Sequence, residues 1–138
     1  MGPAHSPTGT AGRGTPLTAI NKKNISMVEF LLNHGADPNR AGSGDATPLW
    51  KAIRDENNSI FEFLLNHGAD PNRPDSHGDT PLRMAAGWRK KSMVESLLKH
   101  GADPNLPGYG GYYPLDGAVS NKEIKSILIN AGATKRKP

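Results

Sequence analysis

The twelve residues "EFLLNHGADPNR" at 29–40 return unchanged at 62–73, and a variant, "ESLLKHGADPN", occupies 95–105. Successive copies start 33 residues apart. A second phrase, "TPL", stands at 47–49 and 80–82 and becomes "YPL" at 113–115. Self-similarity at one fixed period indicates a repeat protein, because stacked units bury together the apolar faces that a single unit cannot bury alone.

Each unit predicts two short helices. Thr47 and Thr80 suit the N-cap of a first helix, where a hydroxyl accepts a free backbone N–H, and the proline after each suits position N1. Three Ser-x-x-Glu stretches, beginning at Ser26, Ser59 and Ser92, predict a capping box that starts the second helix at the serine. That helix is expected to end at a glycine in the left-handed C′ position. The following "ADPN" then leads into a loop toward the next unit.

The pattern resembles the ankyrin repeat, a β-turn followed by two antiparallel helices with a period of 33 residues and a "TPLHxA" phrase. The stretch "DTPLRMAAGWRKKSMVESLLKHGADPN" at 79–105 matches this pattern along its whole length. The resemblance implies an all-α repeat solenoid, in which stacked helix-turn-helix units are linked by β-hairpin loops. One departure is that Trp50, Arg83 and Asp116 replace the usual histidine after "TPL". Because that histidine is mostly buried in the family, we expect Trp50 to pack.

The expected organisation is a leader, a repeat array and a tail. Residues 1–14 form a disordered leader or a cloning remnant, and the array covers 15–133. Both outer units are irregular, as capping repeats are, so the array is either complete or cut from a longer protein. The basic tail at 134–138 is expected to be a solvated end. Within the array we place the repeats at 15–46, 47–79 and 80–112 and the C-terminal capping repeat at 113–133.

Composition narrows the setting. The absence of cysteine excludes disulfides and thiolate metal sites, and no apolar run is long enough for a membrane helix. These features fit an intracellular protein, cytoplasmic or nuclear, or one acting in a host cytosol if it is a bacterial effector. The net charge is +4, with basic residues at the turns between helices. Acidic residues in the second unit interrupt this row, so we expect a solvated edge and no nucleic-acid partner.

No catalytic constellation is present. The repeated histidines, His34, His67 and His100, lie on successive units about 10 Å apart, too far to share one metal ion. In the resembling family this position braces the hairpin loop by hydrogen bonds. The aspartates of "ADPN" are expected to cap their own turns. The chain carries no nucleophilic triad and no phosphate loop, so we predict no enzyme activity, no metal and no cofactor.

The phrase "LLNHGADPN" also resembles the recognition sequence of the oxygen-dependent asparaginyl hydroxylase that modifies ankyrin repeats. This resemblance implies Asn39, Asn72 and Asn105 as possible hydroxylation targets. The proline before each asparagine departs from the usual valine or isoleucine.

Residues that differ between units are the candidates for function. In the resembling family these positions lie at the hairpin tips and at the ends of the first helices. Trp88, Tyr109 and Tyr112 are expected to gather on neighbouring units, since Trp and Tyr are enriched among interface hot spots. The alternative is that Tyr112 packs onto the last unit and that Trp88 covers a gap beside Gly87. The predicted partner-binding residues are Arg54, Asp55, His77, Asp79, Trp88, Arg89, Tyr109 and Tyr112.

These features predict a non-enzymatic protein–protein interaction module that binds a peptide or a folded partner and is a monomer by itself. One alternative is a nucleotide or RNA binder, by resemblance to the ankyrin domain of the oligoadenylate-activated ribonuclease. Steep salt dependence of binding would favour that alternative. The other alternative is a structural spacer within a larger protein.

Overall fold

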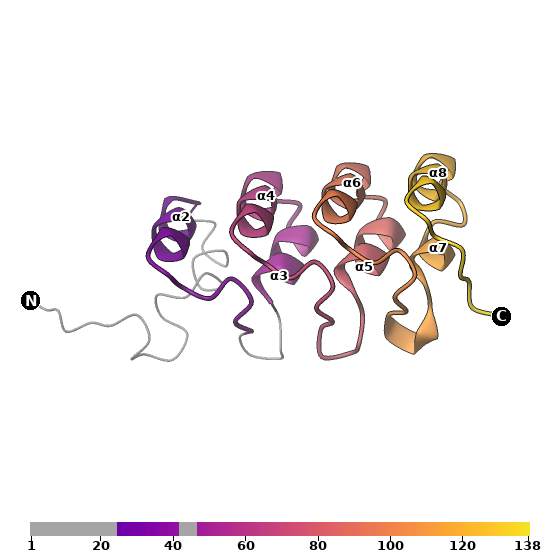
Figure 1. Ribbon diagram of the computed structural model, residues 1–138, viewed down its shortest axis with the longest axis horizontal. Helices are drawn as coiled ribbons and strands as arrows, with labels where there is room; N and C mark the ends of the chain where they lie inside the picture. The colour runs from indigo at the N-terminus through magenta and orange to yellow at the C-terminus, as the bar shows by residue number, and fades with distance from the viewer. Residues whose placement is uncertain (1–24, 42–46) are drawn as a thin grey trace, which may run out of the picture. The chain divides into compact units, whose positions relative to one another are not determined.

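The computed structural model describes residues 25–41 and 47–138, and within these ranges the chain forms helices joined by turns and loops, with no strand. The predicted all-α class is therefore confirmed in the described chain. The chain divides after Ala69 into two compact units, here called unit 1 and unit 2. The elements are α2 (Ile25–Asn33), α3 (Pro48–Arg54), α4 (Asn58–Asn66), α5 (Pro81–Gly87), α6 (Lys91–Lys99), η3 (Tyr109–Gly111), α7 (Pro114–Gly117) and α8 (Lys122–Asn130) (Figure 1).

The helices pair as the repeat predicts. In unit 1, α4 packs against both α2 and α3. In unit 2, α5 packs against α6, α7 packs against α8, and the two pairs contact each other through α5 with α7 and α6 with α8. The loop that contains η3 lies on the side of α7 away from α8 (Figure 1). Unit 2 therefore presents its loops on the side opposite its second helices.

The first helices begin where the sequence predicts. The Thr47 hydroxyl accepts the N–H of Trp50 at 3.1 Å, and the Thr80 hydroxyl accepts the N–H of Arg83 at 3.2 Å. A proline follows each threonine at the first helical position. The N-cap prediction is confirmed for both helices.

The capping-box prediction is wrong for the described second helices. Helix α4 begins at Asn58, one residue before Ser59, and its N-cap is Asn57, whose Oδ1 accepts the N–H of Ile60 at 3.1 Å. The side chain of Asn121 likewise caps α8 by accepting the N–H of Ile124. An asparagine at this position satisfies the N3 amide, so the serine is left inside the helix. Helix α6 starts after Lys90 and has no side-chain cap.

The core of each unit is an apolar layer between first and second helices. In unit 2 the two first helices approach very closely: a Cβ added to Gly117 would lie 3.1 Å from the backbone nitrogen of Gly87. Ala85 and Ala86, close by in the sequence of α5, are fully buried. The largest fully buried side chains are Ile53, Ile60, Phe61 and Leu64 in unit 1 and Leu82, Met93, Leu97, Ile124 and Leu128 in unit 2.

The repeated "ADPN" phrase joins one turn to the next. In unit 2 the Asn72 side chain donates to the carbonyl of Gly101 at 3.3 Å and accepts the N–H of Asp103 at 2.7 Å. Asn105 repeats this pattern, accepting the N–H of Thr134 at 2.9 Å. The backbone at the start of the 134–138 tail is thus hydrogen-bonded to the preceding turn, and all five tail residues are exposed.

Candidate interaction surface

Two loops of unit 2 carry half of the predicted contact residues. We call residues 75–79 the first tip and residues 108–112 the second tip. The first tip is closed by a hydrogen bond from the N–H of Asp75 to the carbonyl of Asp79 at 2.9 Å. The second tip is closed by a hydrogen bond from the N–H of Gly108 to the carbonyl of Tyr112 at 2.7 Å. Both are tight turns that fix the direction of the side chains they carry.

Asp79 links the two tips. Its carboxylate pairs with Arg83 through two hydrogen bonds, of 2.8 Å to Nε and 2.7 Å to one terminal nitrogen. The same carboxylate accepts the N–H of Tyr109 at 3.2 Å. The hydrogen bonding of Arg83 to the Asp79 carboxylate is the main cause that raises the pKa of Arg83 above its usual value. Only 6% of Asp79 is exposed, so this predicted contact residue serves inside the fold and we leave it out of the proposed surface.

The Asp79–Arg83 pair was not recognised from the sequence. The two residues are spaced i, i+4 across the start of α5, and this spacing is a signal that could have revealed the pair. Arg83 stands where the family usually has histidine, and in this chain its side chain pairs with Asp79.

His77 and Tyr109 come together across the two tips. Their rings meet edge to face with centroids 6.2 Å apart, a geometry typical of aromatic pairs. A depression of about 290 Å³ between the tips is lined by these two residues together with Asp75 and Asp79. Tyr109 remains 56% exposed. Its ring is therefore presented to solvent while its backbone is fixed by Asp79.

The predicted gathering of three aromatic residues is incomplete. Trp88 is the C-cap of α5, whereas the backbone of Tyr109 is bonded just before the start of that helix. Eight residues at 1.5 Å each separate Thr80 from Trp88, which places the two sites about 12 Å apart along the helix. Trp88 is 44% exposed and Tyr112 is 45% exposed. Unit 2 therefore presents exposed aromatic side chains at both ends of α5.

The predicted contact residues of unit 1 interact with one another at the end of α3. The Arg54 guanidinium lies 5.2 Å from the centroid of the half-buried Trp50 ring, and its Nε is 3.5 Å from the Asp55 carboxylate. Lys51 also approaches Asp55, at 3.6 Å. Arg54 keeps an exposed surface while Trp50 packs beneath it. The hairpin-tip positions at the end of the first repeat, Ser43, Gly44 and Ala46, lie outside the described residues.

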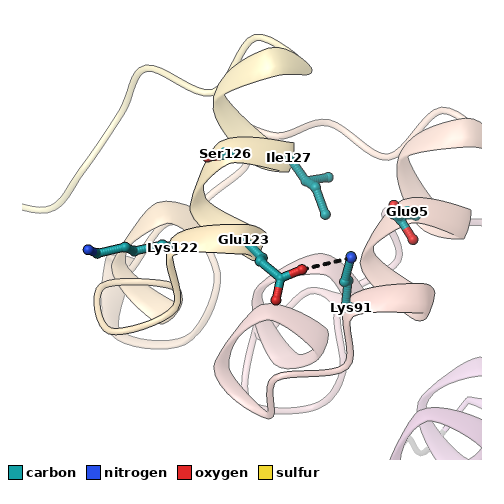
Figure 2. Close-up of a pocket in the computed structure, with 6 residues that line it drawn as sticks. All are labelled: Lys91, Glu95, Lys122, Glu123, Ser126 and Ile127. Atoms are coloured by element: carbon teal, nitrogen blue, oxygen red, sulfur yellow. Dashed lines mark hydrogen bonds and ion pairs between the residues drawn. The ribbon is translucent and has the colours of Figure 1, made fainter.

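The basic edge at the second helices of unit 2 is partly neutralised. Lys91 Nζ lies 2.9 Å from Glu123, in a depression of about 370 Å³ between α6 and α8 (Figure 2). This contact raises the pKa of Lys91 and lowers the pKa of Glu123 from their usual values. Arg89 donates to the Ser120 hydroxyl at 3.2 Å, and Lys122 points away from the ion pair (Figure 2). Lys22 and Lys23, which belong to the same row of basic residues in the sequence, lie outside the described residues.

The repeated polar residues have structural contacts. Each repeated histidine hydrogen-bonds through Nδ1 to the carbonyl four residues earlier, at 2.8, 3.0 and 2.9 Å. The histidines therefore brace the end of the second helix, where we had expected them to brace the hairpin loop. In each "ADPN" phrase the aspartate accepts the N–H of the asparagine two residues later, as predicted. Within 25–41 and 47–138, no cluster of three or more His, Asp or Glu side chains could hold a metal ion.

Hydroxylation of the repeated asparagines stays a prediction. All three side-chain amides donate to a glycine carbonyl in the following turn, at 3.1 to 3.3 Å. A modifying enzyme that needs an extended peptide would therefore have to open this turn first.

Comparison with known proteins supports one assignment. No helix in the described part of the chain is long and apolar enough to cross a membrane. No curated protein matches the sequence. A family model described as ankyrin repeats, in three copies, matches residues 16–108. Together with the helix pairs of each unit, this match shows that the chain belongs to the ankyrin-repeat family.

Proposed function

We propose that this chain is a non-enzymatic protein-interaction module, and that its partner contacts the exposed aromatic side chains of unit 2. Ankyrin repeats generally mediate protein binding. The partner is a peptide or a folded protein that reaches the two tips, with Tyr109 as the central anchor and His77 beside it. Trp88 forms a second contact at the other end of α5.

The observation that carries this proposal is the fixed presentation of Tyr109. Tyr109 is more than half exposed, yet its N–H is held by the buried Asp79 carboxylate and its ring meets the His77 ring edge to face. An aromatic side chain has few rotatable bonds, and a braced backbone leaves little further freedom to lose on binding. Exposed aromatic residues of this kind are typical interface hot spots.

Affinity capture from extracts of the native host tests the proposal, using Tyr109→Ala and Trp88→Ala as separate variants. The matched control is Phe30→Ala, since Phe30 is 54% exposed but lies on the second helix α2 of unit 1. We expect a specific protein to be retained by the wild type and by the control, and to be reduced at least tenfold by Tyr109→Ala. Circular dichroism melts establish that each variant is folded.

Two results would change the assignment. If Tyr109→Ala and the Phe30 control behave alike, the tips are not the contact surface. If only Trp88→Ala loses the partner, the contact lies at the far end of α5. Capture at 50 and 300 mM salt separates a protein partner from RNA, because phosphate contacts lose affinity steeply as salt rises.

A further inference from the structure

The second tip already holds a lysine side chain. Lys137 Nζ donates to the carbonyl of Gly110 at 2.8 Å and lies 4.3 Å from the centroid of the Tyr112 ring. This distance is within the range of cation–π interactions. The backbone N–H of the same lysine is bonded to both carboxylate oxygens of Asp116, at 3.2 and 3.0 Å. A ring face, a carbonyl and a carboxylate thus surround one basic residue.

The backbone conformation of the second tip accommodates the Lys137 side chain. Gly110 has φ = 68°, and a Cβ there would lie 3.2 Å from two ring carbons of Tyr112, so the ring folds over the glycine. Gly111 also has positive φ, and a Cβ added there would meet nothing within 4 Å. Asp116 is oriented by accepting the N–H of Tyr113 at 2.7 Å. These contacts build the acceptor groups independently of Lys137.

The position of Lys137 carries a different residue in the preceding repeat. Gly101 and Gly132 are matching turn glycines, 31 residues apart, and the same offset aligns Lys137 with Leu106. The hydrogen bond from the N–H of Thr134 to Asn105 already fixes the start of the tail, as the bond from the N–H of Asp103 to Asn72 fixes the turn before it. The contacts of Lys137 are therefore additional to the asparagine hydrogen bond that the repeats share.

We propose that Tyr112, Gly110 and Asp116 form a cradle for a lysine residue, that Lys137 occupies it as an internal ligand, and that a basic segment of the protein partner displaces Lys137 on binding. The inference rests on the proposed function, because it names the chemistry of the partner at the same tips. Lys137 is exposed, and exposed cation–π contacts shift an equilibrium by only about two- to fivefold. Such a contact is weak enough for a partner with further contacts to replace it.

An NMR titration of the full chain tests the cradle directly. The probe is the synthetic peptide acetyl-Thr-Lys-Arg-Lys-Pro-amide, which carries the sequence of residues 134–138. In Lys137→Ala the Gly110 carbonyl and the Tyr112 ring lose their lysine, so the peptide is expected to shift the amide signals of Gly110, Gly111 and Tyr112 in a saturable way. The wild type is expected to bind it about two- to fivefold more weakly, because its own lysine competes.

Matched variants identify the source of binding. A peptide with glutamine in place of its second lysine is expected to bind weakly or not at all. In the Lys137→Ala background, Tyr112→Phe keeps the ring face and is expected to keep binding, whereas Tyr112→Leu loses it. In the wild-type background, the ε-methylene protons of Lys137 are expected to show an upfield ring-current shift that Tyr112→Leu abolishes. This last measurement needs no added ligand.

Three results would overturn the proposal: no saturable shifts in Lys137→Ala, equal binding of the glutamine peptide, or equal affinities in the wild type and in Lys137→Ala. The proposed function is tested separately by the Tyr109 variant. If Tyr109→Ala loses a captured protein while the peptide fails to bind the cradle, the tips still bind a partner and only the lysine cradle is wrong. If both fail, the surface itself is wrong.

Discussion

The two tips of unit 2 reach similar turns by different means. In the first tip, the Asp75 carboxylate accepts the N–H groups of His77 and Asp79, each at 2.9 Å, so the loop is stiffened by its own side chain. The second tip has no acidic residue between Gly108 and Tyr112. It turns on glycines with positive φ and is held from outside, by Asp79 at one end and by Lys137 at the other.

The difference predicts which tip depends more on its neighbours. A loop that carries its own acceptor keeps its shape when a neighbour changes, whereas a loop braced from outside responds to whatever occupies the bracing positions. The exposed tyrosines lie on the second kind of loop. A partner that binds as we propose would therefore compete with Lys137 for the groups of the second tip, and it would meet no such competition at the first.

The largest effect is expected from Asp79→Ala, which breaks the connection between the tips. This change leaves the three-quarters buried Arg83 side chain without its partner and removes the acceptor of the Tyr109 N–H. We expect the free energy of unfolding to fall by about 2–4 kcal/mol, because an unpaired, partly buried charge is costly. Urea denaturation measures the change.

The double variant Asp79→Ala/Arg83→Met is the control for this prediction. Removing both charges leaves no unpaired group, so it is expected to recover part of the lost stability. A loss below about 0.5 kcal/mol in Asp79→Ala would place the pair among ordinary surface ion pairs, which contribute little.

An intermediate effect is expected from a matched pair of glycine substitutions, one in each tip. Gly78 and Gly110 both have positive φ, so alanine at either position is expected to cost about 1–2 kcal/mol in unfolding free energy. Only Gly110→Ala also pushes the Tyr112 ring, since nothing lies within 4 Å of a Cβ at Gly78. The ring-current shift of Lys137 is therefore expected to vanish in Gly110→Ala alone. Its loss in both variants would mean that the tips are not independent.

The smallest effect is expected from the ion pair between Lys91 and Glu123, at the second helices of unit 2. Lys91 lowers the pKa of Glu123 below its usual value of about 4.3. A lowered pKa in the folded state means that the pair stabilises the fold above the usual pKa, and that this contribution disappears as the pH falls through the folded-state pKa. NMR titration of Glu123 is expected to show the lowered pKa, and Lys91→Ala to return it to the usual range.

Lys122→Ala is the control for the ion pair. Lys122 adjoins Glu123 in sequence, but its side chain points away from the carboxylate (Figure 2). Its removal is expected to leave the pKa of Glu123 near the wild-type value. A comparable change in both variants would assign the shift to general positive charge and not to the Lys91 contact.

Local signals predicted the repeated elements well and the tips poorly. The N-caps at Thr47 and Thr80 and the positive φ of Gly68 and Gly101 follow from the residue types themselves, because each satisfies a backbone requirement within one turn. The capping-box prediction failed because it considered the Ser-x-x-Glu spacing alone. Asn57 was the better N-cap and stood two residues before Ser59.

The sequence by itself determined the family, the helix pairs and the residues that repeat, since a fixed period leaves little choice about which faces must stack. Only the tertiary structure decided which of the unrepeated residues are available to a partner. Asp79 and Tyr109 looked equivalent in sequence, yet one is buried against Arg83 and the other projects into solvent. The burial of Asp79 depends both on Arg83, four residues away, and on the loop at Tyr109, 30 residues away, and no single repeat contains that information.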